Sequence, residues 1–307
     1  GNRLKPVKNL PADEEPVGES WEVSAVDGSK SIVRNGPLAG WDLAQLTKEY
    51  GPLLLGENVY KKYGDKFPLL VKFIDAAKDL SIQVHPDDVL AKERHNTFGK
   101  TEMWYLVGAD RDAELIMGFN KDTDKSEYLT ALHNHTLPVL LNTEKVEKGD
   151  CFFIPAGTVH AICKGCYIAE IQQTSDITYR IYDYDRRDKN GNPRELHTEL
   201  ATDVINFCEQ KQHSIHYHQH ENHTEELVSC NYFTTNYLKF DKEVEKDYIE
   251  LDSFVIYMCL EGNFTLVYDV DKTVKVNKGE TILVPAILKN LFLIPETEAE
   301  ILEIYIR

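Results

Sequence analysis

The segment Gly149–His160 has the sequence GDCFFIPAGTVH, which is the most informative stretch of the chain. Its apolar run Cys151–Ile154 predicts a short buried strand. Pro155 and Gly157 predict a tight turn after the strand, because proline fixes its own φ and glycine tolerates a positive φ. The segment therefore delivers the side chain of His160 to a defined position just beyond a strand end.

A second segment places two donor side chains on one face of a strand. Ser81–Asp88 has the sequence SIQVHPDD, and residues two apart in a strand point the same way. We therefore expect Gln83 and His85 to point into one space, while Ile82 and Val84 pack on the other side.

Glu102, in the segment KTEMWY of residues 100–105, adds a carboxylate to this set. Together with His85, His160 and Gln83, it gives two imidazoles, one carboxylate and one amide. Such a set suits a divalent metal ion that keeps an open coordination position.

Composition excludes several classes of protein. The chain has 307 residues, of which 42% are hydrophobic and 28% charged, as in ordinary globular proteins. Its formal net charge of −17 argues against nucleic acid or an anionic membrane as a partner, since both require basic surfaces. No apolar run approaches the roughly 20 residues that span a bilayer, and the polar first 20 residues predict no signal peptide.

The six cysteines form no disulfide framework and predict a reducing, cytoplasmic location. Cys163 and Cys166 have the spacing of redox or zinc motifs, but a single pair without a second one is weak evidence for either. We expect most of the cysteines to be small core residues. They are Cys151, Cys163, Cys166, Cys208, Cys230 and Cys259.

Short apolar runs between turn residues predict a mainly β protein with helical insertions. The strands predicted in the first two hundred residues are Phe67–Phe73, Glu102–Val107, Glu114–Phe119, Cys151–Pro155, Tyr167–Gln173 and Thr178–Tyr184. Those predicted later are Tyr232–Phe240, Phe254–Leu260, Gly262–Tyr268, Thr281–Pro285 and Glu300–Ile306. The predicted helices are Leu43–Tyr50, Lys125–His133 and Arg194–Cys208.

An internal repeat predicts two related barrels. Gly279–Pro285 repeats the Gly-x5-Pro pattern of the first segment, but Ile287 and Asn290 stand where the first copy has its second glycine and its histidine. We therefore predict two jelly-roll barrels, of which only the first binds metal. The predicted domains are an N-terminal catalytic domain at 1–207 and a C-terminal degenerate barrel at 228–307, joined by a linker at 208–227.

The predicted linker is rich in histidine but lacks the apolar alternation that would bury a strand face. We interpret it as a solvated segment and not as a metal site. Its histidines are His213, His216, His218, His220 and His223.

The pattern Gly-x5-Pro-x-Gly-x2-His resembles the second motif of the cupin family, which consists of small β-barrels with a metal inside. Further segments narrow the resemblance to type I phosphomannose isomerases in their short bacterial form, over residues 18 to about 196. These segments are QVHPDD at 83–88, KTEMWY at 100–105, GESWE at 18–22, YRIYDYDR at 179–186 and NPRELH at 192–197.

The resemblance implies a zinc enzyme that interconverts mannose 6-phosphate and fructose 6-phosphate through a cis-enediol. It implies that His85, Glu102 and His160 are zinc ligands and that Gln83 is the fourth. It also implies that zinc polarises the sugar carbonyl as a Lewis acid without redox chemistry.

The resemblance further implies that Arg180 is the active-site arginine. Because an arginine stays charged at any working pH, we assign it to the enediolate or the phosphate and not to proton transfer. Lys72, Ser81, Lys100 and Asp176 match positions around the sugar phosphate. We expect Lys100 to bind phosphate as a point charge, and leave the proton-shuttling base open between Lys72 and Asp176.

Two other functions remain open. A cupin dioxygenase would bind Fe(II), but it would favour a His-x-His pair where this chain has Gln83 and His85. A sugar-phosphate sensor would keep the barrel without turnover, although Arg180 and the full ligand set argue against it.

Overall fold

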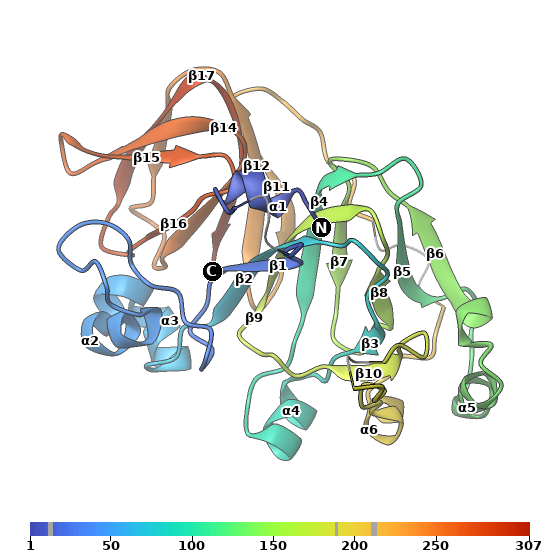
Figure 1. Ribbon diagram of the computed structural model, residues 1–307. Coiled ribbons are helices and arrows are strands. Elements are labelled where there is room, and N and C mark those ends of the chain that lie inside the picture. The colour runs from blue at the N-terminus through green and yellow to red at the C-terminus, as the bar shows by residue number, and fades with distance from the viewer. Residues whose placement is uncertain (12–14, 188–189, 210–213) are drawn as a thin grey trace. The chain divides into compact units, whose positions relative to one another are not determined.

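The structure is a computed structural model that describes residues 1–11, 15–187, 190–209 and 214–307 (Figure 1). Its helices are α1 (Leu4–Val7), α2 (Leu43–Leu55), α3 (Glu57–Tyr63), α4 (Asp88–His95), α5 (Lys125–His133) and α6 (Thr198–Thr202), with the 3-10 helix η1 (Leu137–Leu140). Among the described residues, no helix is long and apolar enough to span a bilayer.

The strands are mostly short and pair antiparallel, which confirms the predicted mainly β class. The first ten are β1 (Glu19–Val23), β2 (Leu69–Asp75), β3 (Ile82–Val84), β4 (Glu102–Ala109), β5 (Glu114–Phe119), β6 (Leu141–Lys145), β7 (Cys151–Ile154), β8 (His160–Ile162), β9 (Cys166–Gln173) and β10 (Tyr179–Tyr182). The later ones are β11 (Thr224–Ser229), β12 (Thr234–Phe240), β13 (Val244–Asp247), β14 (Val255–Tyr268), β15 (Lys272–Asn277), β16 (Thr281–Val284) and β17 (Asn290–Tyr305).

These strands form three sheets. The first has the order β1-β2-β9-β4-β7 and the second the order β10-β3-β8-β5-β6. The third has the order β11-β12-β17-β14-β15, with β13 added on β17 and β16 on β14. In Figure 1 this third sheet runs from pale orange to red.

The chain packs into two compact units whose segments alternate along the sequence. The first unit comprises Gly1–Leu4, Glu15–Ser20 and Phe73–Ile215, and the second comprises Lys5–Glu14, Trp21–Lys72 and His216–Arg307. The division into domains at 1–207 and 228–307 stays a prediction.

The first unit has two apolar clusters, and the faces of β3 explain their separation. Ile82 and Val84 lie in a cluster with Tyr128 and Leu137, from α5 and η1. This cluster covers the outer face of β3. A second cluster, which includes Trp104 of β4, joins residues of the first sheet to residues of the second. The opposite face of β3, which carries Gln83, is thus turned away from the outer cluster, as the alternation predicted.

One predicted helix is largely wrong. Within Arg194–Cys208 only Thr198–Thr202 is helical. The reason is tertiary, because the Asn206 N–H donates to the carbonyl of Gly157 at 2.8 Å instead of continuing a helix. The two strands predicted at 254–260 and 262–268 are one strand, β14, whose register shifts between them.

Candidate metal centre

A row of three side chains crosses the second sheet. Gln83 of β3 lies directly opposite His160 of β8 on one side and Arg180 of β10 on the other. Directly opposed residues of antiparallel strands point to the same face. The register therefore brings together three of the predicted site residues, whose positions in the sequence are far apart.

His85 follows β3 by one residue and shares the face of Gln83. Pro86 and the N-cap residue Asp87 end the strand there and begin α4, and the Asp87 carboxylate accepts from the N–H of Leu90 at 2.9 Å. The His85 ring places Nδ1 2.9 Å from the carbonyl oxygen of Ile177, and only 1% of the residue is exposed. This bond suits a proton on Nδ1 and turns Nε2, with its lone pair, toward the row.

The Pro-x-Gly turn holds both histidine segments. Gly157 has a φ of +88°, and its N–H donates to the carbonyl of His85 at 2.9 Å. His160 follows three residues later, with Nδ1 2.8 Å from the carbonyl oxygen of Thr158 and 1% of the residue exposed. The turn thus links the main chains of the two histidine segments, and in both rings Nδ1 faces a main-chain carbonyl.

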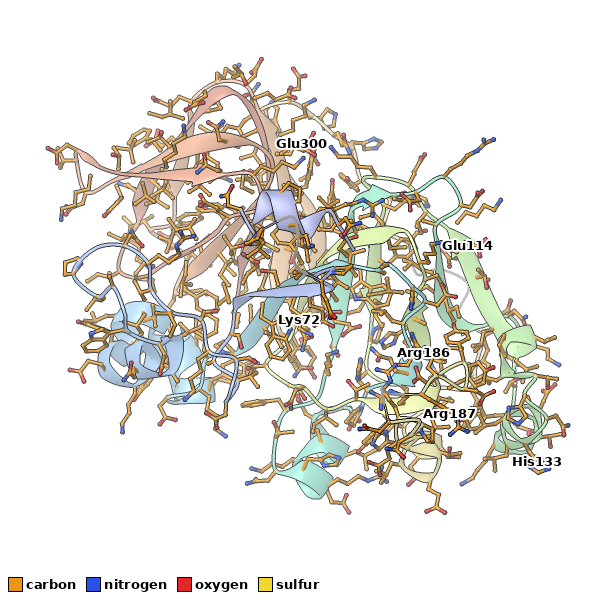
Figure 2. The ribbon with its side chains drawn as sticks, in the orientation of Figure 1. Lys72, Glu114, His133, Arg186, Arg187 and Glu300 are labelled. Carbon is orange, nitrogen blue, oxygen red and sulfur yellow. The ribbon has the colours of Figure 1, made fainter. Side chains whose placement is uncertain are left out.

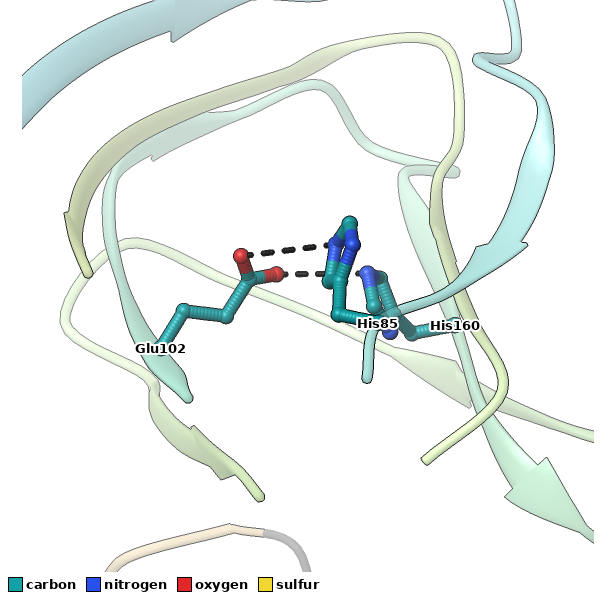
Figure 3. Close-up of side chains that lie close together, drawn as sticks. All are labelled: His85, Glu102 and His160. Atoms are coloured by element: carbon teal, nitrogen blue, oxygen red, sulfur yellow. Dashed lines mark ion pairs between the residues drawn. The ribbon is translucent and has the colours of Figure 1, made fainter. Parts of the chain in front are cut away.

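Glu102 is the first residue of β4 and comes from the opposite sheet. It faces Ile154 of β7 and Gln172 of β9 and is fully buried. Its two carboxylate oxygens lie 3.2 Å from Nε2 of His160 and 3.7 Å from Nε2 of His85, as the dashed lines of Figure 3 mark.

The three side chains form a compact donor set. Each of the three residues offers one ligand atom, a ring nitrogen of His85 or His160 or a carboxylate oxygen of Glu102, and these three atoms lie within 4.8 Å of one another. Ligands about 2 Å from one zinc ion are separated by distances of this order. The side-chain amide of Gln83 completes the set, since its Nε2 is 3.4 Å from Nε2 of His85 and 3.3 Å from Nε2 of His160. Turning the amide over would present its oxygen instead, so the residues fit a divalent metal ion.

Lys100 supplies positive charge beside the buried carboxylate. Its ammonium is 3.0 Å from Oε2 of Glu102 and 3.1 Å from Nε2 of His85, and only 5% of the residue is exposed. A buried carboxylate requires such a counter-charge, because desolvation otherwise disfavours its ionised form. Lys100 therefore touches two of the predicted ligands.

Arg180 is fixed at its main chain and at one end of its guanidinium. Its N–H donates to Nδ1 of His197 at 3.1 Å, and its Nη1 donates to the carbonyl of Glu195 at 2.9 Å. The buried Nε has no hydrogen-bond partner among the described residues. Burial lowers the pKa of the guanidinium and the charge of Arg194 lowers it further, but an arginine still keeps its proton at neutral pH.

A second group of charges lies just beyond Arg180 in the sequence. The buried Asp183 carboxylate accepts from Nε of Arg194 at 2.7 Å and also pairs with Arg186, which is labelled in Figure 2. Burial alone would raise the pKa of Asp183, but the hydrogen bonds and charges of the two arginines outweigh it and hold that pKa below its ordinary value.

Three other predicted residues have different surroundings. Ser81 is buried and lies one residue before β3, two positions from Gln83. Asp176 is exposed in the segment between β9 and β10. Lys72 of β2 (Figure 2) belongs to the second unit, where its ammonium lies 4.7 Å from the ring centroid of Trp21.

Sequence reasoning missed Glu170, which is only 3% exposed. Its carboxylate accepts from the indole N–H of Trp104 at 2.9 Å, and the Trp104 ring packs edge-on against His160 with the centroids 5.3 Å apart. An acidic residue between the apolar residues Ala169 and Ile171 of β9 was the available signal. A buried carboxylate therefore supports the packing around one predicted ligand.

The remaining candidate motifs show no metal-site geometry. His216, His218, His220 and His223 are exposed, as expected for a solvated segment, and His213 lies outside the described residues. Burial raises the pKa of both Cys163 and Cys166 to about 12, which keeps these thiols protonated and unreactive at neutral pH.

Comparison with known proteins identifies the family. A family model, "Phosphomannose isomerase type I, catalytic domain", matches residues 5–134. The mannose-6-phosphate isomerase ManA of Bacillus subtilis is 38% identical over 271 residues, which cover 87% of this chain and 83% of the relative. The chain belongs to the type I phosphomannose isomerase family.

Other relatives of this family agree. The mannose-6-phosphate isomerase of Streptococcus mutans is 41% identical over 205 residues, which cover 67% of this chain and 63% of the relative. The crystal structure of the mannose 6-phosphate isomerase from Bacillus subtilis superposes with a TM-score of 0.89 at 34% identity, covering 100% of this chain and 95% of that one. The phosphomannose isomerase fold thus extends over the whole chain, including residues beyond 200, where the sequence resemblance had weakened.

Proposed function

We propose that the protein is a zinc-dependent isomerase that interconverts mannose 6-phosphate and fructose 6-phosphate through a cis-enediol. Family membership supports the isomerase activity. The observation that carries the metal-dependent form of the proposal is the convergence of His85, Glu102 and His160 within 4.8 Å.

The donor set suits a Lewis acid. Two neutral imidazoles and one carboxylate leave a divalent ion with net positive charge, and Gln83 adds a neutral donor. When bound, zinc would supply polarisation of the sugar carbonyl, which acidifies the neighbouring C–H. The carbonyls of Ile177 and Thr158 fix the two rings, so neither ring needs to turn to present its Nε2 to the ion.

Arg180 would stabilise the negative charge that develops as a proton leaves C1 or C2. It lies beside Gln83 in the row across β10, β3 and β8, and its main chain is anchored to His197. A preorganised cation that loses no proton can hold an enediolate oxygen or the phosphate, but it cannot serve as the base.

The remaining roles are also part of the proposal. Lys100 and Ser81 would bind the substrate, with Lys100 facing the phosphate as a point charge. The proton would move between C1 and C2 on one face of the sugar, with Lys72 or Asp176 as the base. Lys72 is 8% exposed and Asp176 is exposed, and substituting each residue in turn tests the two bases separately.

The expected partners are the two sugar phosphates, with no nucleic acid or membrane, in keeping with the net charge of −17. The cytoplasm remains the proposed location. The six cysteines are free thiols, a state that a reducing compartment maintains.

A coupled assay for conversion of mannose 6-phosphate to fructose 6-phosphate tests the proposal. We expect Arg180→Ala to lower kcat/KM by about a hundredfold or more, the scale of losing one preorganised donor. Arg180→Lys keeps the charge and serves as the matched control, with an intermediate loss. Near-normal turnover of Arg180→Ala would remove this residue from the mechanism.

Metal analysis of unchelated protein separates the alternatives. Stoichiometric zinc supports the proposal. Stoichiometric iron with oxygen consumption would instead indicate a cupin dioxygenase, and binding of mannose 6-phosphate without conversion would indicate a sensor.

A further inference from the structure

The sheet of the second unit repeats the inner rows of the metal-binding barrel with other residues. In the first unit, Ile154, which precedes Pro155, faces Glu102, and Glu102 faces Gln172. In the second unit, Val284, which precedes Pro285, faces Val255, and Val255 faces Tyr305. The register therefore puts an apolar valine at the place of the metal-binding glutamate.

The next inner row keeps a carboxylate. Trp104 faces Glu170 in the first unit, and Tyr257 faces Glu303 in the second. Both glutamates are buried, with exposed fractions of 3% and 2%. The second barrel has thus lost the metal ligands but retains a buried charge at the equivalent position.

A network of polar side chains surrounds Glu303. Its carboxylate accepts from the amide of Asn236 at 2.8 Å and from the hydroxyl of Tyr248, and it pairs with the ammonium of Lys246 at 3.0 Å. Asn236, Tyr248 and Lys246 are all more than nine-tenths buried. A buried ion pair often gives no more stability than apolar packing of similar volume, so stability alone does not account for this network.

The network faces a cavity of about 810 Å³. It is lined by Asn236 of β12, Lys246 of β13, Tyr248 just after β13, and Glu303 and Tyr305 of β17. Small-molecule pockets usually measure about 300–1,000 Å³ and combine a few fixed polar groups with apolar walls. The cavity has the size and the lining for a small ligand.

The chemistry of the lining defines the ligand class. The Asn236 amide hydrogens and the Tyr248 hydroxyl are engaged within the protein, and so are two of the three Lys246 ammonium hydrogens. The Tyr305 hydroxyl accepts from Asn236 and Arg307 and keeps its own hydrogen to donate. That hydrogen, the third ammonium hydrogen and the carboxylate oxygens suit hydroxyl groups, which both donate and accept. Five acidic and three basic side chains line the cavity, so it repels an anion. We propose that this cavity binds an uncharged monosaccharide or polyol, without metal and independently of the sugar-phosphate site.

Saturation-transfer NMR with free mannose and free fructose tests the proposal on the full chain. The measurement is made in a His160→Ala background, which disables the metal centre. We expect saturable binding there, weakened about fivefold by Asn236→Ala and similarly by Tyr305→Phe, the scale of losing one neutral hydrogen bond. Tyr305→Phe removes only a hydroxyl, so it keeps the test valid if Asn236→Ala fails to fold.

Two controls distinguish this site from the active site. Excess mannose 6-phosphate should not displace free mannose, and Lys272→Ala, on the exposed strand β15, should bind like the parent protein. The proposal is overturned if free sugar does not bind, if His160→Ala alone abolishes binding, or if neither cavity variant weakens it. Because the readout is binding, failure here leaves the isomerase assay of the first unit unaffected.

Discussion

Replacing Gly157 by alanine should damage stability and the metal centre together. The φ of +88° costs an L-residue about 1–2 kcal/mol. An added Cβ would lie 2.8 Å from the carbonyl oxygen of Val204, a main-chain atom that cannot move alone. Overpacking of this kind adds about 1–3 kcal/mol, so we expect a total loss of about 3 kcal/mol.

The same clash should displace the candidate metal ligands. The contact is about 0.6 Å inside ordinary van der Waals distance, and the Gly157 N–H holds the carbonyl of His85 at 2.9 Å. A shift of that size in the ligand segments should lower kcat/KM about tenfold, since a 1 Å misplacement costs about a hundredfold. Zinc affinity should fall with it.

Thermal unfolding, zinc stoichiometry and turnover measure these effects. A loss of about 3 kcal/mol should lower Tm by about 6–12 °C. Gly28→Ala is the matched control, because Gly28 has a φ of +83° but nothing within 4 Å of an added Cβ. Gly28→Ala should lower Tm by the cost of the backbone strain alone and should keep the zinc content of the parent protein. If Gly157→Ala matches Gly28→Ala in Tm and zinc content, the reasoning about this turn is wrong.

Three further outcomes are expected. Because the pKa of Asp183 is depressed, its ion pairs stabilise the protein fully above the unfolded-state pKa of about 3.9, and this stability is lost as pH falls through the lower folded value. The urea midpoints of wild type and Asp183→Asn should therefore converge at acid pH. A difference that stays constant with pH would contradict this. In wild type, chelation should lower Tm and abolish turnover, and added zinc should restore both. Glu102→Gln, which loses the charged ligand, should not respond in this way. An equal response of both proteins would exclude Glu102 as a ligand. A thiolate-selective reagent at pH 8 should modify the exposed Cys208 before Cys163 and Cys166, whose pKa values burial raises to about 12, and mass spectrometry showing the reverse order would contradict this.

The local geometry of the site could be predicted from the sequence. Gln83 and His85 share a face because the side-chain period of a strand is two, and His160 follows a turn that proline and glycine dictate. Both features depend on residues within a few positions of one another, so the backbone alone determines them. The role of Glu102 needed the family resemblance, because a glutamate that begins a strand has no local mark of a ligand.

Other features depend on contacts between distant segments. The helix predicted at 194–208 shrinks to Thr198–Thr202 because Asn206 bonds to Gly157, some fifty residues earlier in the chain. Lys72, which matches a family position around the substrate, falls in the second compact unit, and its role as a base stays a proposal. No local pattern contains either fact.

Local sequence was enough to predict the strand-and-turn segments, the mainly β class and the shared face of Gln83 and His85, since these follow from side-chain period and turn residues. Three-dimensional packing was needed to show that Lys100 contacts both Glu102 and His85, that Glu170 bonds to Trp104, and that polar side chains surround Glu303 in the second unit. The register of paired strands sets the distances between segments that are far apart in the chain. A single strand pairing fixes many such distances at once.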